Sequence, residues 1–168
     1  MSKIDWKISM LCFWLAYFLV TTIGVGHTIF NGTVLKMETM AQLSKTENLS
    51  DVADTNYAYG TAYAKTIPFH PLYNIVIWPL FAFLYFRMTK LEKNQWITAL
   101  YLGLSWSIIT IVFDLFGWVI IKHPLTMSWK AFYLDYQPWI TLIYIVIFIS
   151  TYIGMFFYKK ISQKHRIQ

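Results

Sequence analysis

Charged residues and cysteines are both scarce in this chain. Asp, Glu, Lys and Arg make up 13% of its 168 residues, roughly half the share found in ordinary soluble domains. A soluble protein of this size has too few polar groups to cover a composition that is 57% hydrophobic. The single cysteine, Cys12, excludes an intrachain disulfide, a Cys-x-x-Cys redox motif and a cysteine-rich metal site.

Four long apolar runs take up more than half of the chain. An α-helix rises 1.5 Å per residue, so about 20 residues cross the roughly 30 Å hydrocarbon core of a bilayer. The runs lie at about residues 8–30, 70–88, 96–121 and 139–158. We therefore predict an all-α integral membrane protein, with one bundle of four transmembrane helices over residues 1–168 and outer loops at 31–67 and 122–138.

The basic residues are distributed unevenly between the two sides of this bundle. The side with the two termini and the link near residues 88–95 carries nine basic and two acidic residues, a net charge of +7. The opposite side carries five lysines and five acids, a net charge of zero. Cationic loops stay in the cytoplasm, so we expect both termini to be cytoplasmic. The basic side predicts membrane lipids as partners, not nucleic acid.

We expect the first apolar run to be a membrane helix that stays in the protein. It is too long for a signal peptide and is followed by no small-x-small cleavage pattern. A short chain rich in Ile, Lys, Tyr and Phe is typical of bacteria, so the glycosylation sequons at Asn31 and Asn48 are interpreted as chance. These features predict a multi-pass protein of a bacterial cell (plasma) membrane.

The second outer loop carries an aromatic face at helical spacing. Ser128 can cap a short helix at the start of this run, and Pro138 ends it. The aromatic residues between them are Trp129, Phe132, Tyr133 and Tyr136. The spacing of i, i+3, i+4 and i+7 predicts a short amphipathic helix in the outer membrane interface. The simpler interpretation is a clamp on the bundle, and the alternative is a lid over an outward-facing pocket.

Asp114 is the one acid inside an apolar run. A carboxylate there costs several kcal/mol unless it is paired, hydrated or protonated. The small and polar residues at steps of three or four that share its face are Gly103, Ser107, Thr110 and Gly117. Small residues permit close helix packing, so we expect Asp114 to point into the bundle.

Three of the four histidines are expected at a similar depth to Asp114, near the outer ends of the spans. They are His27, His70 and His123. One hypothesis is a proton-transfer pair, or another polar pair, of Asp114 with His27. In that case the expected ligand-binding residues are His70, His123, Ser107, Thr110, Asn74 and Tyr136. The structural alternative is that Asp114 pairs with His27, Asn74 or a tyrosine and fixes the register of the bundle. The histidines have no metal-ligand spacing, so no metal site is predicted and the cofactor is left unknown.

Two functional hypotheses follow from these features. The first is a non-enzymatic membrane protein: an accessory subunit, an immunity protein or a protein that binds a small ligand or lipid, with another membrane protein or a second copy as a further partner. The second is a membrane-embedded enzyme or proton-coupled carrier with an outer-leaflet pocket around Asp114 and His27. We prefer the first, because the chain has few catalytic residues and no room for a soluble active site.

Overall fold

The computed structural model describes residues 4–35, 60–90, 94–122 and 127–164. This part of the chain is helical and contains no β-strand, which confirms the predicted all-α class. His123 and Asn48, both considered above, lie outside these ranges.

Within the described ranges, four helices are long and apolar enough to cross a membrane, as predicted. The elements in chain order are α1 (Trp6–Thr33), α3 (Gly60–Thr66), η2 (Ile67–Phe69), α4 (His70–Thr89), α5 (Gln95–Asp114), η3 (Leu115–Ile120), η4 (Ala131–Asp135) and α6 (Trp139–Lys164). Two of them, η3 and η4, are π-helical. The spans are the pattern of a multi-pass membrane protein, because a helix satisfies its backbone polar groups internally in lipid.

The second span begins earlier in the sequence than predicted. We expected it to start near residue 70, after an outer loop over 31–67, but α3, η2 and α4 form a helical stretch from Gly60 onward. Two of the three prolines in this stretch, Pro68 and Pro71, occupy the first turns of η2 and α4, and Pro79 lies inside α4. Proline is tolerated in a first turn because the N–H it lacks has no partner there. The prolines therefore do not stop the helix.

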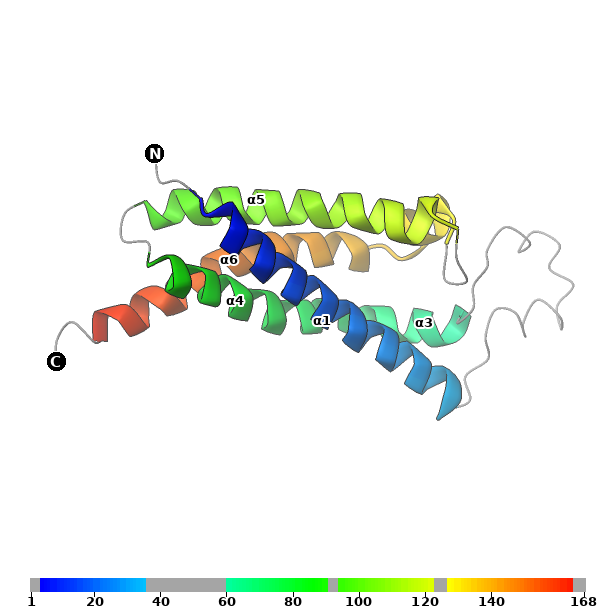
Figure 1. Ribbon diagram of the computed structural model, residues 1–168. Coiled ribbons are helices and arrows are strands. Elements are labelled where there is room, and N and C mark those ends of the chain that lie inside the picture. The colour runs from blue at the N-terminus through cyan, green and yellow to red at the C-terminus, as the bar shows by residue number, and fades with distance from the viewer. Residues whose placement is uncertain (1–3, 36–59, 91–93, 123–126, 165–168) are drawn as a thin grey trace, which may run out of the picture.

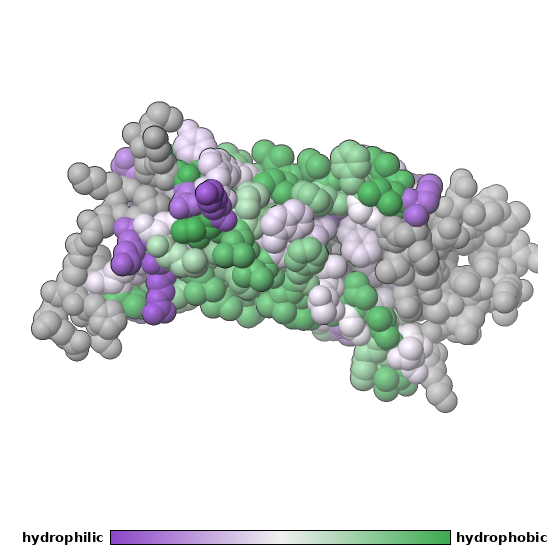
Figure 2. Space-filling model, viewed as in Figure 1, coloured by the Kyte–Doolittle hydropathy of each residue, from purple (hydrophilic) through white to green (hydrophobic). Residues whose placement is uncertain are grey.

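The lateral surface of the bundle is apolar. Between 28% and 39% of the residues in the most apolar window of each span are buried within the protein, so most of them face outward. Figure 2 shows an apolar band along the bundle, with hydrophilic side chains gathered mainly at one end. Such a surface is stable when lipid covers it.

The bundle has two distinct ends (Figure 1). At the terminal end, α1 begins, α6 ends and α4 is followed by α5; at the α3 end lie α3, η3 and η4. Helix α1 crosses the other helices diagonally. Near the terminal end it is joined to α5 by a hydrogen bond that the Trp106 Nε1 donates to Ser9 Oγ over 3.1 Å. Toward the α3 end α1 lies beside α3, where Asn31 Nδ2 donates to Thr66 Oγ1 over 3.0 Å.

Helix α6 packs closely against α4 and α5 at two glycines. A Cβ added at Gly154 would lie 2.6 Å from the Cβ of Ala82 and from the backbone nitrogen of Phe83. A Cβ at Gly103 would lie 2.8 Å from Thr151 Oγ1, and this threonine donates to the Ala99 carbonyl over 2.8 Å. Glycine therefore sets the distance between these helices, as small residues do in membrane bundles.

The segment before α6 lies against the α3 end of the bundle. Phe132 is buried, whereas Trp129 and Leu134 are exposed. Tyr136 packs edge-on against the Tyr63 ring of α3, with centroids 5.2 Å apart. The segment is helical where it was predicted to be, and its place in the membrane interface stays a prediction.

Candidate functional site

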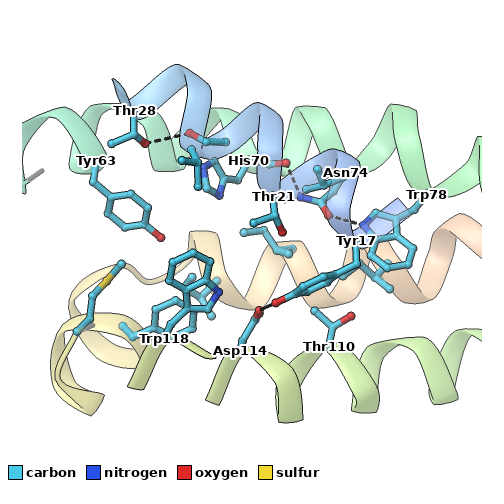
Figure 3. Close-up of a pocket in the computed structure, with 18 residues that line it drawn as sticks. Tyr17, Thr21, Thr28, Tyr63, His70, Asn74, Trp78, Thr110, Asp114 and Trp118 are labelled. Atoms are coloured by element: carbon cyan, nitrogen blue, oxygen red, sulfur yellow. Dashed lines mark hydrogen bonds between the residues drawn. The ribbon is translucent and has the colours of Figure 1, made fainter. Parts of the chain in front are cut away.

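A cavity lies inside the bundle, in the half nearest the α3 end (Figure 3). Its volume is about 110 Å³. The second half of α1, the first halves of α4 and α6, and the junction of α5 with η3 form its walls. Tyr63 of α3 and two residues of the segment before α6, Met127 and Phe132, line it from the α3 end.

Most of the cavity wall is apolar. Helix α6 contributes Ile140, Ile143 and Ile147, and α1 contributes Val20 and Val25. An apolar wall with a few polar groups is the usual composition of a small-molecule site. The polar groups therefore determine what the cavity can hold.

Asp114 supplies the carboxylate of this cavity and binds three helices together. It is the last residue of α5. The Tyr17 hydroxyl of α1 donates to its Oδ1 over 2.9 Å, and the Tyr144 hydroxyl of α6 donates to its Oδ2 over 3.0 Å. The Trp118 indole is a third donor to this carboxylate. Each carboxylate oxygen has two acceptor positions, so the carboxylate retains capacity for one further donor from a ligand.

The change from α-helix to π-helix occurs directly after Asp114. Helix α5 ends at this residue and the π-helical η3 follows. A π-helical turn widens the helix and is frequently found at functional sites. Thr110, one turn before Asp114, and Trp118, one turn after it, line the same cavity.

A second tyrosine pair extends from this carboxylate toward the surface. The hydroxyls of Tyr144 and Tyr133 interact, and Tyr133 belongs to η4, outside the spans. Burial raises the pKa of Tyr133 above its usual value, the hydrogen bond with Tyr144 lowers it, and the charge of Asp114 raises it. Tyr133 is partly exposed, so hydroxyl groups connect the cavity acid with the surface of the bundle.

His70 has a ring nitrogen without a partner at the cavity wall. Its Nε2 is buried and makes no hydrogen bond within the described part of the chain. A Cβ added at Gly24 of α1 would lie 3.0 Å from this nitrogen, so the absence of a side chain there makes room for the imidazole. A buried polar atom without a partner requires an explanation, and an absent ligand is one of the usual ones.

Two further polar side chains of the cavity already have partners within the protein. Asn74 Nδ2 donates to the His70 carbonyl over 2.7 Å, and its Oδ1 accepts from Trp78 Nε1 over 2.6 Å. Thr110 Oγ1 donates to the Trp106 carbonyl over 2.8 Å. Asp114 and His70 are the groups that can both recognise a ligand and change their charge, and the Thr21 and Tyr63 hydroxyls also line the cavity.

The structure brings together only part of the predicted site. Four of the predicted residues line the cavity: Asp114, His70, Asn74 and Thr110. The partners of Asp114 are Tyr17, Tyr144 and Trp118. His27 Nδ1 instead pairs with the Tyr73 hydroxyl, and His27 lies outside the cavity lining. Ser107 Oγ donates to the Tyr144 carbonyl over 3.3 Å, and Tyr136 packs on Tyr63. His123 lies outside the described residues.

The alternative that Asp114 pairs with a tyrosine is confirmed, but sequence reasoning did not identify which tyrosines hold it in place. The two tyrosines, Tyr17 and Tyr144, are inside apolar runs, where a phenol hydroxyl needs a partner because water is absent. Asp114 is the one acid at a similar depth. This signal was present in the sequence, but it did not distinguish these two from the other tyrosines of the chain.

Among the described residues, no group of three or more His, Cys, Asp or Glu side chains is placed to hold a metal ion. Comparisons with protein-family models, curated proteins and solved structures give no match. The class of protein therefore follows from the structure alone. The chain has the architecture of a multi-pass helical membrane protein, with a cavity inside its four-helix bundle.

Proposed function

We propose that the chain is a small polytopic protein of the cell membrane that binds a small amphipathic ligand inside its bundle. The cavity between the four spans is the observation that supports this function. A water molecule needs about 10–15 Å³ of such volume, and the cavity offers about 110 Å³. A ring or a short branched chain fits this space.

The expected topology places this cavity in the outer half of the bilayer. The net charge of +7 lies on the side of the two termini and the residues near 88–95, which supports a cytoplasmic terminal end. The cavity then opens to a ligand that partitions into the outer leaflet. The segment from Met127 to Pro138 covers it from the membrane interface, because Met127 and Phe132 are buried against it.

The polar groups of the cavity favour binding over catalysis. The Thr28 and Thr110 hydroxyls each donate to a carbonyl of their own helix, over 3.0 and 2.8 Å. Neither has a general base that would activate it as a nucleophile. Asp114 and His70 remain as groups that recognise a ligand.

A second candidate function is that of a proton-coupled carrier or membrane-embedded enzyme. It is favoured by the hydroxyl chain from Asp114 through Tyr144 to Tyr133. Hydroxyl groups both donate and accept, so such a chain can pass protons. Proton uptake by liposomes that contain the protein distinguishes the two: a carrier takes up protons in a substrate-dependent manner and loses this on Asp114→Asn, whereas a binding protein shows no such flux.

Native mass spectrometry of the protein released from mild detergent tests the binding function. We expect a bound molecule of defined mass in the wild type, and a reduced occupancy in Gly24→Ala because the added methyl group displaces the His70 ring and narrows the cavity wall that Gly24 itself lines. Gly26→Ala is the matched control, since a Cβ at Gly26 meets no atom within 4 Å. An empty wild-type chain would contradict the proposal, and a bound polypeptide would instead support an accessory or immunity role.

A further inference from the structure

The cavity carries an acidic group without a positive partner. Asp114 lies among 18 lining residues that include no lysine or arginine. Its hydrogen-bond donors within the protein are uncharged: the Tyr17 and Tyr144 hydroxyls and the Trp118 indole. A carboxylate in a low-dielectric setting costs several kcal/mol when no cation compensates it. The bundle thus presents an acid whose ionised form is stabilised by a ligand with one positive charge.

His70 does not supply the missing positive charge. Its Nε2 is buried without a hydrogen-bond partner in the described part of the chain. An imidazolium ion would place a charged N–H there with nothing to accept it, and burying an unpaired charge is costly. The imidazole is therefore neutral in the free protein, and it offers one polar atom to a ligand.

Aromatic rings surround the cavity. Five of its lining residues are Tyr, Trp or Phe, and they come from five different elements of the fold: Tyr17, Tyr63, Trp78, Trp118 and Phe132. Figure 3 shows Tyr17 against Asp114, with Trp118 and Tyr63 toward the α3 end and the Tyr63 hydroxyl directed inward. The face of an aromatic ring attracts a cation, and rings around a carboxylate are suited to ammonium groups.

Two other kinds of ligand fit the lining poorly. A phosphate-bearing lipid headgroup is recognised by arginine or lysine, and among the described residues neither lines the cavity. Calcium takes six to eight oxygen ligands, whereas Asp114 is the single carboxylate here and the Asn74 oxygen is occupied by Trp78. What remains is a cation with an apolar body.

On the basis of the proposed binding function, we propose that the ligand is an organic monocation without a phosphate group. Its ammonium group lies against the Asp114 carboxylate, between the rings of Tyr17 and Trp118. Its apolar body lies along Ile140, Ile143 and Ile147. A polar atom on that body, where present, reaches His70 Nε2.

Benzylamine and benzyl alcohol are the probes that test this proposal. They have nearly the same size and shape, but only benzylamine is positively charged at neutral pH. Binding of each to the wild-type protein in nanodiscs is measured by tryptophan fluorescence and calorimetry. We expect benzylamine to bind roughly tenfold or more tightly than benzyl alcohol, since pairing a buried charge contributes that much or more.

Variants connect this preference to Asp114. In Asp114→Asn we expect benzylamine to lose its advantage while benzyl alcohol binds as before. Asp135→Asn is the matched control, because it removes an exposed acid of η4 outside the cavity, and it should leave both affinities unchanged. The wild-type comparison of the two probes stands on its own if the Asp114 variant fails to fold.

The outcomes separate this inference from the function it rests on. Equal affinity of the wild type for both probes, or an unchanged preference in a folded Asp114→Asn protein, would overturn the organic cation and leave the binding function intact. Binding of neither probe, together with an empty chain in native mass spectrometry, would overturn both.

Discussion

Gly154→Ala tests the helix packing on which the cavity depends. The new Cβ would lie 2.6 Å from Ala82 Cβ and Phe83 N and 2.7 Å from the Pro79 carbonyl oxygen, and ordinary contacts begin at 3.4 Å. Two of these atoms belong to the backbone of α4, so no side-chain rotation relieves the clash. Helices α4 and α6 must separate locally by about 0.8 Å, the difference between 3.4 and 2.6 Å. Overpacking of this kind costs about 1–3 kcal/mol, or more where the backbone has to move.

The assay is reversible unfolding in mixed micelles, with an increasing fraction of sodium dodecyl sulfate and tryptophan fluorescence as the signal. We expect Gly154→Ala to lower the free energy of unfolding by about 2–3 kcal/mol. Gly117→Ala is the control, because a Cβ there meets no atom within 4 Å, and it should change stability by less than about 0.5 kcal/mol. A Gly154→Ala protein as stable as the wild type would refute the close α4–α6 crossing.

Three further substitutions test other contacts by the same unfolding assay. Gly103→Ala brings a Cβ to 2.8 Å from a backbone oxygen of α6 and should cost about 1–3 kcal/mol; an unchanged stability would contradict that contact. Asn74→Leu removes the acceptor of the buried Trp78 indole and should cost about 1–3 kcal/mol. A variant as stable as the wild type would disprove this contribution of the hydrogen bond. Tyr144→Phe removes one donor from Asp114 and should cost about 0.6–1.7 kcal/mol, the range of interhelical hydrogen bonds in membranes; a stabilised protein would argue against the bond.

The membrane architecture is predictable from the sequence because one physical constraint dominates it. A span has to satisfy its backbone polar groups internally and bury about 20 apolar residues in lipid, so hydropathy alone locates the four helices. The helix α3, which precedes the second apolar run, is different. Its residues from Gly60 to Thr66 are a mixture of small and polar ones, and the helix is stabilised by packing against α1, including the bond of Asn31 to Thr66. Composition does not report such tertiary contacts.

The candidate site shows the same division between local and tertiary information. The inward orientation expected of Asp114 depends on the cost of a carboxylate in lipid and on the residues of its own helix, which sequence reveals. Its partners depend on how α1 and α6 cross α5. The diagonal course of α1 brings Tyr17 to Asp114 and carries His27 toward Tyr73. A single sequence contains the tyrosines but not the crossing angles that select among them.

The most direct measurement of the central claim is an experimental structure of the protein from a lipid environment, at a resolution that shows density inside the bundle. We predict density for a bound molecule in the cavity, with its polar end within hydrogen-bonding distance of the Asp114 carboxylate while Tyr17 and Tyr144 keep their bonds to it. A cavity filled by the protein's own side chains, with Asp114 closed off from any ligand, would contradict a binding function at this site.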